Sequence, residues 1–107
     1  MFRWLKILDF TRVFSWPFCT GYFASYWAEV IKVEHNLYWD ESRSFPPVKN
    51  NSSWYFEILN HNKQSITLDL SNIDDYNIII DLIKDCDVVV ENFSPEVKFK
   101  LKIEYIE

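Results

Sequence analysis

The sequence predicts an α/β domain with a mainly parallel sheet, built from two strand–helix–strand units. Short runs rich in β-branched or aliphatic residues, at 7–10 and 30–34, flank an apolar segment of helical length. A second pair of runs, at 65–70 and 87–91, flanks a segment with helical periodicity. Because parallel strands need a crossover connection, helices between the strands favour a parallel sheet. An irregular connection over 35–53 joins the two units.

The first unit begins with the strand at 7–10. Pro17 suits the first turn of the following helix, expected over 18–27, because the missing N–H would be unpaired there anyway. The run VIKVE at 30–34 is the second strand, since β-branched residues favour extended backbone. Within the connection to the second unit, residues 54–59 are predicted to form one or two helical turns.

The second unit pairs a half-buried strand with a buried one. Residues 65–70 alternate between apolar and polar, and one face of that strand is expected to be apolar: Ile66, Leu68 and Leu70. The unbroken apolar run DVVVE at 87–91 predicts a strand buried on both faces. A loop over 92–95 leads to a last helix, expected over about 96–101.

The helix between these two strands carries the clearest local signals. Ser71 is expected to cap it, and Asp74 and Asp75 suit the positive end of the helix dipole. An apolar stripe at helical spacing is predicted to face the sheet: Ile73, Tyr76, Ile80 and Ile83.

Composition excludes several classes of protein. The 107 residues are 49% hydrophobic and 25% charged, which indicates one globular domain rather than a disordered chain. A net charge of −5 argues against general binding to nucleic acid or to an anionic membrane. No apolar run approaches the roughly 18 residues of a membrane span, and Asp9 interrupts any signal-peptide core, so a cytoplasmic protein is expected.

Common catalytic and cofactor motifs are absent. There is no GxGxxG, no P-loop, no HExxH and no GxSxG, so a dinucleotide, a metal or a serine nucleophile is not expected. Cys19 and Cys86 stand alone and are interpreted as buried, reduced thiols. A single glycine in the whole chain means that tight turns must be made almost without it.

Four stretches together resemble the N-terminal region of the class III CoA-transferase family, in order and in spacing. They are LKILDFTRVFSWPFCT (5–20), AEVIKVEH (28–35), NHNKQSITLDL (60–70) and DVVVENFSPEV (87–97). The resemblance spans about residues 5–106, and its most specific parts are NKQSITLDL and DVVVENF. The family includes formyl-CoA transferase, carnitine CoA-transferase and the α-methylacyl-CoA racemases.

This resemblance implies a Rossmann-like half domain, residues 1–107, that binds coenzyme A or acyl-CoA. It assigns to the ligand Val13, Phe14 and Ser15 along the cofactor, His35 near the adenosine, the strand end Leu68, Asp69, Leu70 and Ser71 facing the adenine, and Asn92, Phe93 and Lys100 around the nucleotide. Full-length members interlock as pairs of chains. The resemblance therefore implies a homo-oligomer or a complementing C-terminal chain as partner.

Three positions depart from the family pattern by replacing a glycine. They are Trp16 in the loop after the first strand, Trp27 before the second strand, and Glu96 after Asn-Phe-x-Pro. Glycine is needed where φ is positive or where backbones touch, so altered local geometry is expected at these positions.

The family's catalytic aspartate, which forms an acyl anhydride and then an aspartyl-CoA thioester, is expected beyond the equivalent of Glu107. No residue of this chain is assigned that role. Asp9 and Asp69 are interpreted as local hydrogen-bond acceptors, and His35 as a solvated loop imidazole.

Three functions follow from these observations. The favoured one is a truncated or split CoA-transferase that is inactive alone. Aromatic residues make up 19% of the chain, which suggests that part of its surface is covered by later residues in full-length relatives. The alternatives are a stand-alone CoA-binding module, and an interaction protein that keeps the fold without the ligand.

Overall fold

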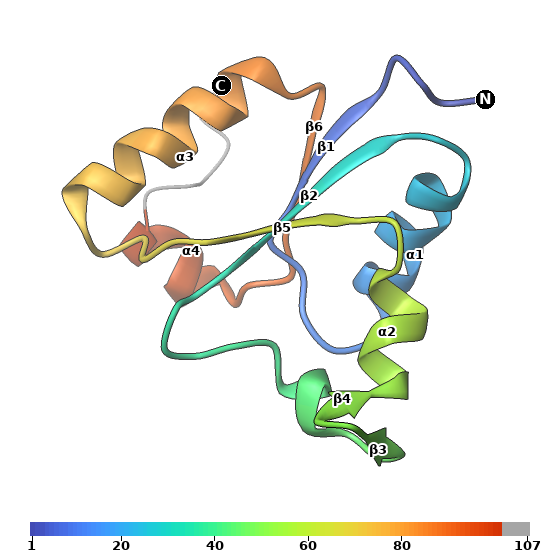
Figure 1. Cartoon of the computed structure of the whole chain (residues 1–107). Coiled ribbons are helices and arrows are strands. Elements are labelled where there is room, and N and C mark those ends of the chain that lie inside the picture. The colour runs from blue at the N-terminus through green and yellow to red at the C-terminus, as the bar shows by residue number, and fades with distance from the viewer. Residues whose placement is uncertain (102–107) are drawn as a thin grey trace.

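A four-stranded parallel sheet with the order β5-β2-β1-β6 organises the chain (Figure 1). The computed structural model describes residues 1–101, and their side chains up to residue 98. The strands of this sheet are β1 (Lys6–Asp9), β2 (Glu29–Glu34), β5 (Gln64–Thr67) and β6 (Val88–Val90). All three strand pairs are parallel, so the α/β class predicted from the sequence is confirmed.

Helices cover both faces of the sheet. The helices are α1 (Ser15–Ser25), α2 (Trp54–Asn60), α3 (Ile73–Asp85) and α4 (Pro95–Leu101). In Figure 1, α1 and α2 lie on one side of the strands and α3 lies on the other. The connection between β2 and α2 contains a short 3-10 helix and a two-stranded ribbon: η1 (Glu41–Ser44), β3 (Val48–Lys49) and β4 (Ser52–Ser53).

Alternation along the strands divides the interior into two clusters. The cluster facing α1 contains Leu5, Ile7, Ala24, Ala28 and Val30. The cluster facing α3 contains Leu8, Phe10, Val33, Leu68 and Ile79. Successive side chains of a strand point to opposite faces, which is why the neighbours Ile7 and Leu8 belong to different clusters. The apolar face predicted for residues 65–70 is confirmed, because Ile66 and Leu70 also pack on the second cluster.

The start of α3 differs from the sequence prediction. Asn72, not Ser71, caps the helix, and its side chain accepts hydrogen bonds from the amides of Asp74 and Asp75. Ser71 is already engaged, because its hydroxyl donates to Asp69 Oδ1 at 2.6 Å. Both acidic residues of the predicted first turn are in place.

The buried stripe of α3 is also displaced from its predicted position. Ile79 is fully buried at its centre, whereas Ile73 is 68% exposed. Leu82 and Ile83 pack on the same cluster, so only part of the predicted stripe faces the sheet. With the cap at Asn72, Ile73 is the first residue of the helix and lies outside the contact with the sheet.

The prediction of a fully buried strand at 87–91 is wrong. Val88 and Val89 are each 41% exposed. The reason is position: β6 is an edge strand that pairs with β1 alone among the strands of the described chain. The apolar residues predicted a buried strand. An edge strand has a neighbouring strand on one side only, so its side chains have less cover.

The face of the sheet toward α1 and α2 buries charge as well as apolar side chains. Asp9 and Lys63 form an ion pair of 2.9 Å, and both side chains are almost fully buried. Asp9 also accepts hydrogen bonds from the hydroxyls of Thr11 and Thr20. The expectation that Asp9 is a local acceptor is therefore confirmed, and its oxygens join the β1–α1 loop to Lys63, in the turn between α2 and β5.

The backbone conformation at the three positions that replace a family glycine, and the surroundings of the one glycine, Gly21, can be compared in the structure. Trp27 has φ 77°, in the left-handed region that favours glycine, which confirms the expectation of a special geometry there. Trp16 and Glu96 are not among the residues with positive φ. The one glycine, Gly21, lies in α1 where it crosses α2, and a Cβ at that position would overlap the carbonyl oxygen of Leu59.

We predict that Gly21→Ala destabilises the fold by about 2 kcal/mol, because α1 must move away from α2 to make room. Without this contact, alanine would stabilise the helix by roughly 1 kcal/mol relative to glycine. A decrease in the free energy of unfolding therefore indicates close contact between α1 and α2. Urea unfolding measures it, with Asn77→Ala, an exposed position on α3, as the control. Stabilisation by Gly21→Ala would show that the helices are not in close contact.

Candidate functional site

A cavity of about 360 Å³ opens at the carboxyl ends of the parallel strands. Ligands of open α/β sheets bind at this edge, where loops and helix starts converge. The strands and the loops that follow them supply its lining: Phe10, Arg12, Val33, Glu34, His35, Tyr38, Asp40, Leu68, Asp69, Leu70, Ser71 and Phe93.

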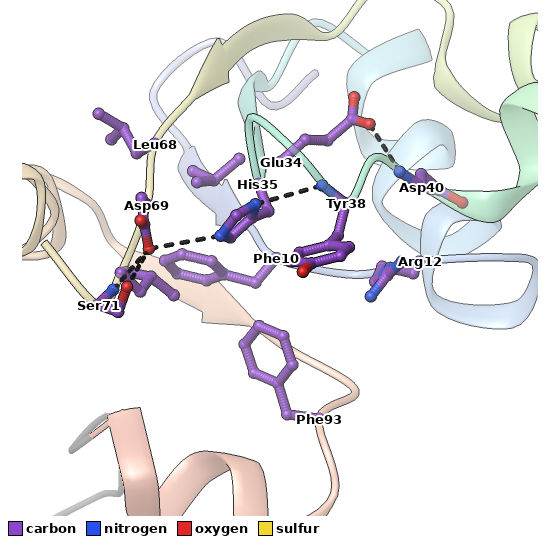
Figure 2. Close-up of a pocket in the computed structure, with 12 residues that line it drawn as sticks. Phe10, Arg12, Glu34, His35, Tyr38, Asp40, Leu68, Asp69, Ser71 and Phe93 are labelled. Atoms are coloured by element: carbon purple, nitrogen blue, oxygen red, sulfur yellow. Dashed lines mark hydrogen bonds and ion pairs between the residues drawn. The ribbon is translucent and has the colours of Figure 1, made fainter.

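One wall of the cavity is apolar and partly aromatic. The rings of Phe10 and Phe93 contact each other with centroids 6.1 Å apart, and Figure 2 shows both bordering the cavity. Leu68 and Val33 complete this wall from neighbouring strands. Such a surface suits a flat apolar group or a heterocyclic ring, since an aromatic face stacks on any base.

His35 and Asp69 face each other across the ends of β2 and β5. His35 Nε2 lies 3.4 Å from Asp69 Oδ1. Its Nδ1 accepts hydrogen bonds from the amides of Leu37 and Tyr38, so Nε2 is assigned a ring proton (Figure 2). The expectation of a solvated imidazole is wrong, because the side chain is only 29% exposed and both nitrogens have partners.

Asp69 is held in its anionic form. The hydroxyl and the amide of Ser71 both donate to Oδ1, and these hydrogen bonds place the pKa of Asp69 below its usual value. The carboxylate is therefore charged at neutral pH. Its expected role as a local acceptor is confirmed by the turn that it closes with Ser71.

Arg12 follows β1 and lines the cavity beside Tyr38. Its Nη2 pairs with Glu41 Oε1 at 2.8 Å and donates to the carbonyl of Trp39 at 3.0 Å. Its Nε is buried and has no hydrogen-bond partner within the described chain. Sequence reasoning missed Arg12 as a site residue, because nothing in its neighbourhood of the sequence marks it.

A second buried ion pair lies behind the cavity. Lys32 Nζ contacts Asp40 Oδ2 at 2.9 Å and donates to the Thr11 carbonyl at 2.7 Å. Burial alone would raise the pKa of Asp40, but the charge of Lys32 and the hydrogen bonds from Lys32 and Ser42 outweigh it, and the pKa is lowered. This carboxylate therefore stays anionic although no solvent reaches it.

Glu34 is held in the same way. Burial would raise its pKa, yet hydrogen bonds from Arg43 and from the Asp40 amide bring the pKa below its usual value. Glu34 and Arg43 approach to 2.7 Å. The two carboxylates that line the cavity beside Arg12 are thus both neutralised by cations behind it.

The structure brings about half of the sequence-predicted site residues together. Six of them line the cavity: His35, Leu68, Asp69, Leu70, Ser71 and Phe93. Their shared position follows from topology, because the carboxyl ends of β2, β5 and β6 meet at one edge of the sheet.

The other predicted residues lie elsewhere. Val13 donates its amide to Asp40 Oδ1, Phe14 packs against Phe18 and Tyr55, and Ser15 is the first residue of α1. Asn92 exchanges two hydrogen bonds with the backbone of Arg12, so it ties the loops after β1 and β6 together. Lys100 belongs to α4, and its side chain lies outside the described residues.

Two further searches concern the described residues only. No group of three His, Cys, Asp or Glu side chains there could hold a metal ion. None of the helices in that part of the chain is long and apolar enough to cross a bilayer. Both cysteines there are free thiols, and each is half-buried rather than buried.

The chain belongs to CoA-transferase family III, whose model matches residues 4–107. Formyl-CoA:oxalate CoA-transferase of Bradyrhizobium sp. (strain ORS 278) is 49% identical over 94 residues, covering 87% of this chain and 22% of that protein. An acyl-CoA transferase of Fusarium pseudograminearum is 41% identical over 110 residues, covering 94% of this chain and 24% of that protein. The chain therefore spans about a quarter of the length of these relatives, at their N-terminal part.

Solved structures show the same likeness. A CAIB/BAIF family protein from Brucella suis matches with a TM-score of 0.85 at 29% identity, over 94% of this chain and 28% of that one. A hypothetical protein from Mycobacterium tuberculosis matches with a TM-score of 0.84 at 30% identity, over 97% of this chain and 28% of that one.

We predict that Glu34→Gln lowers the free energy of unfolding at pH 7 by about 2 kcal/mol, since it weakens charge-assisted hydrogen bonds. A carboxylate with a depressed pKa stabilises the fold above its unfolded pKa and loses that contribution as pH falls through the folded value. Wild-type stability should therefore fall below about pH 4.5, and the variant should fall less. Urea unfolding between pH 3 and 7 tests this, with the exposed Glu29→Gln as control. Parallel curves for Glu34→Gln and wild type would contradict it.

Proposed function

We propose that this chain is the CoA-binding segment of an enzyme that moves coenzyme A between carboxylic acids. The single observation that carries this proposal is the cavity at the carboxyl edge of the sheet, with an aromatic wall, in a chain of CoA-transferase family III. In such an exchange a thioester to one acid breaks and a thioester to a second acid forms, with the CoA sulfur carried across. A cytoplasmic location is also a proposal.

The adenosine end of coenzyme A is the part that fits this cavity. We expect Phe93 to stack on the adenine, with Leu68 and Val33 against its edge. Asp69 would accept hydrogen bonds from the ribose. The loop of Val13, Phe14 and Ser15 would guide the pantetheine arm toward the thiol end.

The chemistry itself belongs to residues outside these 107. Within the cavity the carboxylates are either paired with cations or engaged by Ser71, and none is placed as a free nucleophile. We propose that the isolated chain binds ligand without turnover and that a complementing C-terminal chain, or a covalent continuation, supplies the catalytic carboxylate. Turnover of formyl-CoA with oxalate by the purified chain would overturn this assignment.

We predict that coenzyme A binds with a Kd on the order of 0.1 mM, and that Phe93→Ala weakens it about tenfold through loss of about 1.4 kcal/mol of stacking. Phe93→Leu keeps an apolar side chain without an aromatic face, so it should fall between the two. Calorimetric titration measures binding. The melting temperatures of the two variants and the wild type show whether loss of the Phe10–Phe93 contact also destabilises the fold.

Trp4→Ala is the matched control, because it removes an exposed aromatic ring that does not line the cavity. Equal affinity of wild type and Phe93→Ala would remove the adenine site. No binding of coenzyme A by any variant would instead favour an interaction protein without ligand.

We further propose that α1 is an assembly surface. An aromatic ridge, defined as Phe14, Phe18, Tyr22 and Tyr26, runs along it at intervals of four residues, and all four side chains are at least 41% exposed. Phe14 stacks on Phe18 and Tyr22 contacts Tyr26, so the ridge consists of two pairs of contacting rings. Contiguous exposed aromatic surface of this kind marks interaction sites. A second copy would cover it where a complementing chain is missing.

We predict that the chain self-associates with a dissociation constant on the order of 10 μM, since each large aromatic side chain contributes roughly 1.5–3 kcal/mol on burial. Tyr22→Ser should weaken association at least tenfold, whereas Ile78→Ser, an exposed apolar position on α3, should not. Sedimentation equilibrium separates these outcomes. A monomer at 100 μM would show that the aromatic ridge does not mediate association.

A further inference from the structure

A second group of aromatic side chains lies beside the loop that leads out of the cavity. Phe14 stacks on Phe18 with ring centroids 6.3 Å apart and contacts Tyr55 at 6.1 Å. Tyr55 in turn contacts Phe45 at 5.2 Å. These four residues, named the aromatic cluster, come from the start of α1, the start of α2 and the residue after η1. In Figure 1 the loop after β1 enters α1 beside α2, which brings these segments together.

The aromatic cluster is close to the cavity along the chain. Arg12 lines the cavity, and Phe14 follows two residues later. Val13, which lies between them, donates its amide to Asp40, and Asp40 also lines the cavity. The backbone of Val13 is held at φ 76°, a conformation that a β-branched residue rarely takes. The path from the cavity to the cluster is therefore a short and constrained stretch of backbone, which the pantetheine arm of coenzyme A would follow.

The rings of the cluster are accessible and have no cation against their faces. Phe14 is 52% exposed and Phe18 is 58% exposed. Within the described residues, none of the cation–ring contacts involves a ring of the aromatic cluster. Arg43, which precedes Phe45 by two residues, is engaged by Glu34 at 2.7 Å. A flat neutral group can therefore stack on these rings, whereas a carboxylate would lose hydration there without gaining a side-chain counter-ion.

We propose that the aromatic cluster is the acyl subsite of this chain and that it favours an aromatic acyl group over a small or an anionic one. The substrate class is then the CoA thioester of an aromatic carboxylic acid. Phe14 determines the preference, because it is exposed and its ring contacts both Phe18 and Tyr55. The inference rests on the proposed function, since it assumes that coenzyme A occupies the cavity with its thiol end toward the loop of Val13, Phe14 and Ser15. It deepens that function by naming the class of acid.

Calorimetric titrations with benzoyl-CoA, acetyl-CoA and succinyl-CoA test this inference, because these thioesters differ only in the acyl group. Tyr22→Ser is the common background, since it weakens the self-association predicted for the aromatic ridge, which shares Phe14 and Phe18 with the cluster. Benzoyl-CoA should bind on the order of tenfold more tightly than either of the others. Phe14→Ala should bring the ratios of the dissociation constants near one, and Phe14→Leu should keep part of the preference. Trp4→Ala, which removes an exposed ring outside the cavity and the cluster, should leave the ratios unchanged.

Equal binding of the three thioesters, or tighter binding of acetyl-CoA or succinyl-CoA, would overturn the inference while leaving the proposed function intact. A preference for benzoyl-CoA that survives in Phe14→Ala would also overturn it. If none of the thioesters binds, the proposed function fails and the inference fails with it. The ratios in the chain that retains Phe14 are measured independently, so a folding defect in Phe14→Ala cannot hide the answer.

Discussion

The ammonium group of Lys32 fixes the edge of the sheet at which the cavity forms. It extends from β2 and bonds both the carbonyl of Thr11, in the loop after β1, and the carboxylate of Asp40, in the loop after β2. An isolated buried charge is very costly, so both loops must stay where they complete its shell. Asp40 in turn receives the amides of Val13 and Ser42. The walls of the cavity are thus placed by one buried cation and the acceptors that surround it.

A chain with one glycine has to manage positive φ by other means. Asn50, Asn51 and Asn62 take the left-handed conformation in turns, and asparagine tolerates it because its short side chain bonds locally. Val13 and Trp27 take it without that help, which implies that surrounding contacts hold them there. Glycine is retained only at the α1–α2 crossing, where no Cβ fits. Residues other than glycine thus take positive φ in this chain, as at Val13 and Trp27, whereas the position at which a Cβ would overlap the neighbouring backbone is a glycine.

The apolar surface of the segment agrees with its share of the family fold. Edge strand β6 leaves Val88 and Val89 half-exposed, and α1 leaves its aromatic ridge in solvent. The chain spans about a quarter of the length of its relatives. In full-length relatives, the remaining residues are available to cover the exposed surfaces of β6 and α1. The segment therefore has a cavity at the carboxyl edge of its sheet and exposed apolar surfaces on β6 and α1. This is the arrangement proposed for a CoA-binding part.

The sequence by itself determined the class of fold, because hydrophobic periodicity and β-branched runs place strands and helices locally. It also determined the family, and with it six residues of the cavity, since the ends of parallel strands converge at one edge. It misplaced the cap and stripe of α3, where Asn72 and Ser71 compete for the same turn. Only the tertiary structure decided the burial of β6, which depends on a neighbouring strand, and the pairing of Lys32 with Asp40. Such pairings join side chains that local pattern cannot relate, so they became visible only in three dimensions.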